Sequence, residues 1–170
     1  MLIARYAKIA MCIALAAFCL LVAFDNVFDP QANYTFVAHV MSMDTIFPDN
    51  KIMYRSVTNP LWWTVCYSLI IATQFICGLL FLAGGVQMWR ARFASGANFD
   101  HAKTYAIAGC LLAFLLWFFV FMVIAGEWFA MWQSKEWNAQ QASFRFYVTV
   151  LAVLIFLNQR DTDLPERASK

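Results

Sequence analysis

Four long apolar runs divide the chain, and polar or turn-forming residues separate them. The first extends from Ile9 to Phe24, and the third, from Tyr105 to Gly126, contains no charged residue. The second, from Leu61 to Met88, is longer than a hydrocarbon core of roughly 30 Å requires. The fourth is uninterrupted only from Phe146 to Leu157, so we expect it to include flanking polar residues. The pattern predicts four membrane-spanning helices.

These runs predict a single four-helix transmembrane domain over residues 1–158. Its spans are expected at about 7–25, 61–88, 104–126 and 142–159, by the length that a bilayer requires. The bulky end of the first run does not suit signal peptidase, so we expect a retained signal-anchor helix. Residues 159–170 form a polar cytoplasmic tail, which we expect to be disordered.

Positive charges are distributed unevenly between the two sides that these spans define. Eight of the twelve Lys and Arg residues fall in the N-terminus, the middle loop and the C-terminal tail, and four fall in the two larger connections. Cytoplasmic segments carry the excess of Lys and Arg, so both termini are expected in the cytoplasm. We therefore predict an all-α, multi-pass protein of the cell inner membrane, a four-transmembrane-helix bundle that is N-in and C-in.

The composition excludes several classes of protein. Of the 170 residues, 63% are hydrophobic and 13% are charged, whereas soluble domains have about 25% charged residues. A net charge of +2 is too small for the basic face that nucleic-acid binding needs. All five cysteines fall within the spans without C-x-x-C spacing, which indicates buried apolar residues. We expect the lipid bilayer as a partner, no nucleic acid and no cofactor.

Few polar side chains lie at membrane depth. Gln74 lies about midway along the second span, where an amide is expected to form an interhelical hydrogen bond. Ionisable residues, which proton relays and ion pathways usually need, are almost missing from the span centres. His39 and His101 fall on opposite sides of the membrane, so they cannot ligate one haem.

The segment around His39 allows two interpretations. An imidazole with the thioethers of Met41 and Met43 would suit Cu(I). On a helix, however, these three side chains diverge. Phe36, Val40 and Met43 instead share one helical face, which favours an amphipathic helix along the membrane interface. We assign no metal site.

The densest cluster of aromatic and polar residues follows the third span. If the third helix continues, Glu127, Met131 and Ser134 share one face, and two tryptophans share the adjoining one. Tryptophan favours the level of the lipid headgroups, so this cluster predicts a helical, aromatic-rich extracytoplasmic cap. Its structural or interaction candidates are Trp128, Trp132, Gln133, Trp137 and Asn138.

Two ion pairs are expected in this cap. Glu127 and Arg145 lie at the outer ends of consecutive helices, which makes them the first candidates for an interhelical pair. Arg55 with Asp44 is the second. A pair that locks the cap is favoured over a catalytic acid with an electrostatic partner.

One set of residues, spread over nearly the whole chain, is specific as a combination. It comprises Asn26, Asp29, Asn33, Phe36-Val37, His39-Val40, Met43-Asp44-Thr45, Arg55, Trp117, Glu127-Trp128-Phe129, Met131-Trp132-Gln133-Ser134, Trp137-Asn138 and Phe144-Arg145. At these residues the chain resembles a bacterial family of predicted small integral membrane proteins, a domain family of unknown function. The resemblance implies a four-helix inner-membrane protein and brings no activity, substrate or cofactor.

Three functions are compatible with the sequence. The lack of buried charge and of a nucleophile constellation favours a non-enzymatic accessory, assembly or interaction subunit of a larger membrane complex or a homo-oligomer. A small transporter or channel is the alternative, and it requires a path past Gln74. A metal-binding or catalytic site on the outer face, using His39, Asp44 or Glu127, is the third.

Overall fold

The computed structural model describes residues 2–164, and all the regular elements in this range are helical. Seven segments make up the main path of the chain, and the short turns η1 (Met53–Arg55) and η3 (Met131–Gln133) lie in its connections. The segments are α1 (Leu2–Phe28), α2 (Pro30–Ser42), α3 (Pro60–Arg90), α4 (Gly96–His101), α5 (Thr104–Phe114), η2 (Leu115–Trp128) and α6 (Gln140–Leu157).

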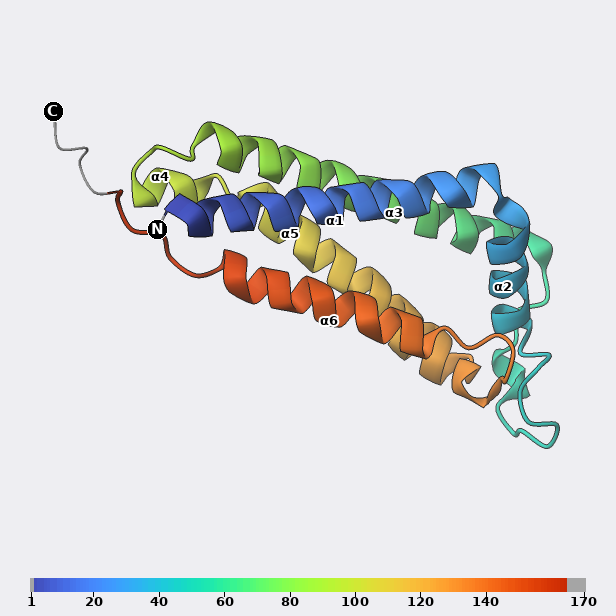
Figure 1. Cartoon of the computed structure of the whole chain (residues 1–170). Coiled ribbons are helices and arrows are strands. Elements are labelled where there is room, and N and C mark those ends of the chain that lie inside the picture. The colour runs from blue at the N-terminus through green and yellow to red at the C-terminus, as the bar shows by residue number, and fades with distance from the viewer. Residues whose placement is uncertain (1, 165–170) are drawn as a thin grey trace, which may run out of the picture.

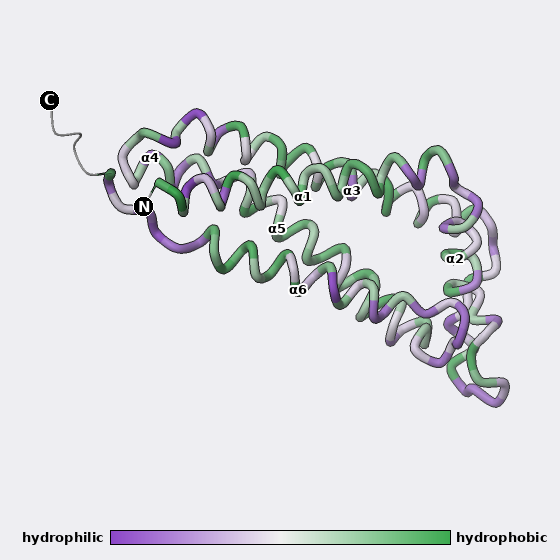
Figure 2. The backbone as a smooth tube through the Cα atoms, in the orientation of Figure 1, coloured by the Kyte–Doolittle hydropathy of each residue, from purple (hydrophilic) through white to green (hydrophobic). Residues whose placement is uncertain are grey.

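Four helices are long and apolar enough to cross a membrane, as the sequence predicts. They are Leu2–Phe28, Pro60–Arg90, the nearly continuous Gly96–Trp128 and Gln140–Leu157. Figure 2 shows the same pattern, with apolar colour along the helices and polar colour gathered at their ends. The start of α3 is fixed locally, because the Asn59 side chain accepts a hydrogen bond from the Leu61 N–H and Pro60 occupies the first turn.

The helices form two arms that diverge like the sides of a V (Figure 1). In one arm α1 packs along α3, and in the other α6 packs against α5 and η2, while α3 also contacts α5. The arms meet at the end that carries the chain termini, which we call the terminal end. They separate toward the opposite end, where α2 crosses the opening. We call that opposite end, with α2 and residues 43–59 and 129–139, the loop end.

The segment η2 has π-helical hydrogen bonding over its 14 residues. At its end the Phe129 N–H donates to the Ile124 carbonyl at 3.0 Å, a bond that spans five residues. The wider helical repeat changes which side chains share a face, because a π-helix has more residues in each turn than an α-helix. Side chains that α-helical spacing would place on one face therefore lie on different faces along η2.

Small residues and sulfur fill the centre of the bundle. Cys12, Cys19, Cys77 and Cys110 are completely buried as free thiols, as predicted, and we call this region the cysteine core; Cys66, in contrast, is only half-buried. Phe81 lies in the cysteine core and is also completely buried.

Candidate functional site

An ionic cluster closes the terminal end. It consists of the cations Arg5, Lys8 and Lys103 with the carboxylates Asp100 and Asp161. The Lys103 ammonium lies 2.6 Å from oxygens of both carboxylates, and Lys8 also donates to Asp161. Three chain segments far apart in sequence are joined in this way.

Main-chain carbonyls complete the same cluster. Arg5 donates to the carbonyls of Arg92, Ala94 and Thr162, and both lysines donate to the carbonyl of Gln159. Burial alone would raise the pKa of Asp161, but hydrogen bonds from Lys103 and Lys8 hold that pKa below its usual range. The carboxylate is therefore charged at neutral pH and serves as a structural anchor.

The predicted disorder of the tail is wrong for residues 159–163. The Asp161 side chain is only 8% exposed, and the Asp163 carboxylate accepts a hydrogen bond from the Gly96 N–H at 2.6 Å. These contacts order the segment because three buried cations need its oxygens. Pro165 and the rest of 165–170 lie outside the described residues.

Two long connections are tied together at the loop end. The Gln133 side-chain oxygen accepts hydrogen bonds from the Asn50 amide at 2.7 Å and from the Phe47 N–H at 3.2 Å. The buried Ser134 hydroxyl accepts from Thr45 and from the Trp137 N–H, both at 2.9 Å. Gln133 and Ser134 thus hold the connection before α6 against the loop that follows α2.

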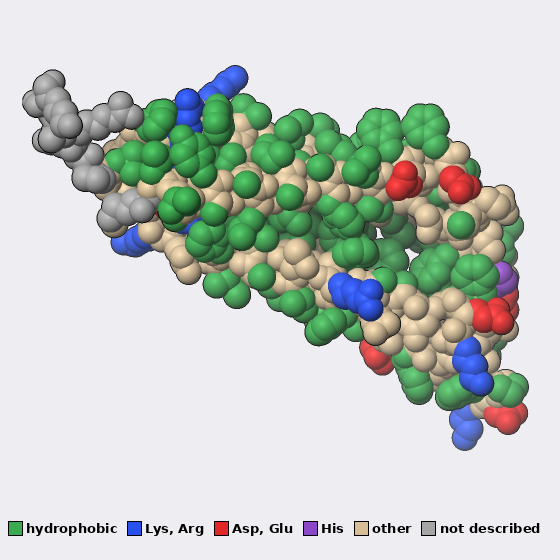
Figure 3. All heavy atoms as spheres, viewed as in Figure 1, with side chains coloured by type: hydrophobic (Ala, Val, Ile, Leu, Met, Phe, Trp, Pro, Cys, Tyr) green, Lys and Arg blue, Asp and Glu red, His purple; other side chains and the backbone are tan. Residues whose placement is uncertain are grey.

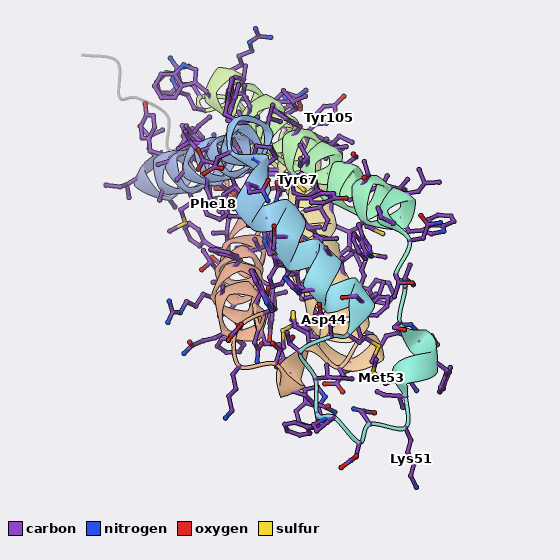
Figure 4. The ribbon with its side chains drawn as sticks, turned by 90° about the vertical axis from the view of Figure 1, so that its right-hand side faces the viewer. Phe18, Asp44, Lys51, Met53, Tyr67 and Tyr105 are labelled. Atoms are coloured by element: carbon purple, nitrogen blue, oxygen red, sulfur yellow. The ribbon has the colours of Figure 1, made fainter. Side chains whose placement is uncertain are left out.

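His39 is part of this framework. Its Nδ1 lies 2.7 Å from an Asp44 carboxylate oxygen, and its ring stacks on Trp137 with centroids 4.6 Å apart. Met41 and Met43 are buried in the core of the loop end. In Figure 4, Asp44 lies at the end of α2, with Lys51 and Met53 farther out on the loop. Residues 2–164 contain no group of three His, Cys, Asp or Glu side chains able to hold a metal.

Both expected ion pairs are wrong. Among the described residues no salt bridge joins Glu127 to Arg145, and both are exposed. Asp44 pairs with His39, while the Arg55 guanidinium lies 4.6 Å from the centre of the Trp128 ring. The expectation for Glu127 and Arg145 rested only on their places at the outer ends of consecutive helices, and both side chains are exposed there.

Variants of Glu127 and Arg145 are accordingly expected to be additive. Glu127→Gln and Arg145→Gln should each change the free energy of unfolding by about 0.5 kcal/mol or less, because exposed substitutions usually do. The double variant should equal the sum within about 0.5 kcal/mol. Unfolding in detergent mixtures measures this, and a coupling above about 1 kcal/mol would show that the two side chains do touch.

The predicted continuation of the third helix is also wrong. The helix ends at Trp128, and Ala130 has a φ of 52°, a left-handed conformation that turns the chain. The short turn η3 follows and buries Met131 at 1% exposure. Asn138 lies just before the N-cap residue of α6, and its side chain accepts a hydrogen bond from the Gln140 N–H at 3.0 Å.

A cavity of about 190 Å³ lies between the arms, on the loop-end side of the cysteine core. Gln74 borders it and makes the expected interhelical hydrogen bond, in which the Asn26 amide donates to the Gln74 oxygen at 2.9 Å. The Tyr67 hydroxyl donates a hydrogen bond of 2.6 Å to the main-chain carbonyl of Asn26, which adds a second link between α1 and α3 beside Gln74. Figure 3 shows the surface hollowed between the arms near α2.

The sequence did not single out as site residues Asn26 and Ser143 at the cavity or the five residues of the ionic cluster. Asn26 was named only as part of the resemblance, because it follows Asp25 just beyond the first apolar run. Ser143 lies just before the uninterrupted apolar stretch of α6 and was treated as a flank. Asp161 carried no local signal, since its partners are in other segments.

The fold and these sites define a small helical membrane protein with several spans and a cavity between its arms that no charged residue lines. The chain belongs to the family described as predicted small integral membrane protein (DUF2165), whose model matches residues 4–160. Neither the curated proteins nor the solved structures show a significant match to it.

Proposed function

We propose that this protein is a non-enzymatic accessory or interaction subunit of a larger inner-membrane complex. The loop end is its docking surface, and we place it on the extracytoplasmic side because Lys and Arg are concentrated at the other end. One observation carries the proposal: large aromatic side chains stay exposed on a loop end that is cross-braced by hydrogen bonds.

The exposed aromatic residues form a surface that we call the aromatic rim. Its members, Phe47, Tyr54, Trp128 and Trp132, are 54%, 76%, 50% and 48% exposed. Phe47 and Trp132 contact each other edge to face with centroids 6.0 Å apart. Exposed aromatic residues on a rigid support are typical of the anchors of protein interfaces.

Arg55 links the other two members of the rim. Its guanidinium lies over the rings of Tyr54 and Trp128, with distances to the ring centres of 5.5 and 4.6 Å. It also donates to the Trp128 carbonyl at 3.4 Å. Arginine and aromatic residues are enriched at protein interfaces, and their fixed positions here reduce the entropy cost of docking.

A transporter is the second candidate, supported by the cavity beside Gln74. Toward the terminal end, however, the centre of the bundle is closed at Cys19, Cys77 and Phe81, which are completely buried. A transport cycle would need the arms to separate there. The metal-binding or catalytic alternative rests on His39, Asp44 and Glu127. His39 pairs with Asp44 within the hydrogen-bonded framework of the loop end, and Glu127 is exposed.

Crosslinking at the aromatic rim tests the docking surface. A photoreactive phenylalanine analogue at Trp132 should crosslink to a discrete membrane protein in native membranes, and the adduct should comigrate with a larger complex in mild detergent. The matched control replaces Leu69, which is 60% exposed in α3 and is expected to face lipid.

The outcomes separate the candidates. A Trp132 adduct to a second copy of this chain would assign the docking surface to a homo-oligomer. If the protein migrates alone and Trp132 crosslinks no more than Leu69, the rim anchors the protein in lipid headgroups and the subunit proposal fails.

A further inference from the structure

Three buried polar side chains border the cavity between the arms and have unused hydrogen-bonding capacity. Asn26, Gln74 and Ser143 are 5%, 4% and 2% exposed, and they come from α1, α3 and α6. Within residues 2–164 the Asn26 side-chain oxygen accepts no hydrogen bond. The Gln74 amide nitrogen and the Ser143 hydroxyl make no side-chain hydrogen bond there either. A buried polar atom without a partner is costly, so the Asn26 oxygen points to a ligand, and the Gln74 and Ser143 groups lie at the same cavity.

The walls of the cavity fit a flat ring. Phe36, Trp117, Phe121 and Phe146 line it. Its volume of about 190 Å³ exceeds the roughly 150 Å³ that accommodates a benzene ring in an apolar protein cavity. Aromatic walls favour stacked or edge-to-face contact with a second aromatic ring.

The charge of the cavity limits the ligand further. None of the residues that line it is an Asp, Glu, Lys, Arg or His. A phosphate or carboxylate head would be buried there without a counter-charge, at a cost of several kcal/mol. The ring must therefore be neutral.

An apolar groove provides space for a hydrocarbon chain attached to this ring. The groove, of about 700 Å³, runs between α1 and α6 and is lined by residues such as Met11, Leu15 and Val153. Phe146 borders both the groove and the cavity. Its ring contacts Phe18 of the groove and Trp117 of the cavity, with centroids 4.9 and 5.5 Å away, so the two spaces adjoin at these rings. Phe18 is labelled in Figure 4.

We propose that the space between the arms binds a neutral, hydroxylated aromatic ring with a long apolar chain, the chemistry of a reduced isoprenoid quinol. The ring occupies the cavity and the chain follows the groove between α1 and α6. A hydroxyl of the ring donates a hydrogen bond to the Asn26 side-chain oxygen and accepts one from the Gln74 amide nitrogen. The Ser143 hydroxyl forms a hydrogen bond with the same hydroxylated ring. The oxidised quinone has carbonyls without a proton to donate, so it leaves the Asn26 oxygen without a partner.

Binding to the full-length protein in phosphatidylcholine nanodiscs tests this site. Three probes are compared: a benzoquinol with a decyl chain, kept reduced under argon; its oxidised quinone; and decylbenzene. Native mass spectrometry counts bound molecules, and the ligand-dependent rise in melting temperature gives the affinity. The expected result is one quinol per chain, bound roughly tenfold more tightly than decylbenzene, with the quinone in between.

Two variants locate the site. Gln74→Leu should weaken quinol binding roughly tenfold and leave decylbenzene binding unchanged or tighter. Ser143→Ala should weaken quinol binding by a smaller factor, and it keeps the proposal testable if Gln74→Leu does not fold. The matched control is Ser68→Ala, in an exposed position of α3 away from the cavity, which should change nothing.

Three results would overturn the proposal. Failure of the folded wild type to bind the quinol saturably would mean that the cavity holds only water. Equal affinities for quinol and decylbenzene would show an apolar void without recognition of the hydroxyl. The third result is that Ser143→Ala binds the quinol as tightly as Ser68→Ala does, and that Gln74→Leu, where it folds, also binds it without change. The ligand would then bind elsewhere.

Discussion

Replacing Asp161 with asparagine is expected to lower the free energy of unfolding by about 3–5 kcal/mol, the usual cost of removing one partner from a buried ion pair. The Lys8, Lys103 and Arg5 side chains beside it are 3%, 3% and 1% exposed. Without the carboxylate, Asp100 is the remaining anion of the cluster, and the amide of asparagine brings an N–H group toward the ammonium groups. Unfolding in mixed detergent micelles at neutral pH measures the loss.

The matched control is Asp25→Asn, which removes one exposed carboxylate at the opposite end of α1 and should have little effect. The pH dependence gives a second check. Because the folded protein holds the Asp161 pKa below its usual range, this stabilisation is present at neutral pH. It should disappear as the pH falls below about 4 toward the folded-state pKa. The Asp161→Asn variant should lose less unfolding free energy than the wild type when the pH is lowered through this range. An equal loss in both proteins would contradict the anchor role of Asp161.

The elements that the sequence predicts well are those whose signal is local. The spans follow from uninterrupted apolar runs, and the burial of Cys12, Cys19, Cys77 and Cys110 follows from their positions within those runs. The bond of Gln74 follows from the cost of an unpaired amide in hydrocarbon. Each of these inferences needs only the residue and its immediate neighbours.

The predictions that failed required knowledge of how distant segments meet. Glu127 and Arg145 lie at the ends of consecutive spans, but which way each side chain faces depends on how η2 and α6 pack, and η2 is π-helical where α-helical spacing was expected. Asp161 lies in a polar tail and becomes an anchor only where that tail returns to Arg5 and Lys8. The cavity exists because the arms diverge, and no run of residues encodes that angle.

Replacing Gly84 with alanine is expected to destabilise the protein by about 1–3 kcal/mol, the usual cost of overpacking a well-packed core. A Cβ atom at this position would lie 2.5 Å from the main-chain nitrogen of Ala106 and 2.9 Å from its Cα. Both atoms belong to the backbone of α5, so the clash is relieved only if α3 and α5 move apart. The contact lies where the two arms meet, and their separation would also loosen the cysteine core.

Gly85→Ala is the matched control, one residue farther along the same helix. Its added Cβ would approach the Cδ1 atom of Ile13 at 2.5 Å, but this is the tip of a flexible side chain that can rotate away. Both variants gain the same helix propensity, about 1 kcal/mol, so the difference between their unfolding free energies isolates the contact with the α5 backbone. Equal stabilities would mean that α3 and α5 pack less closely than the structure shows, and the angle between the arms would then need another cause.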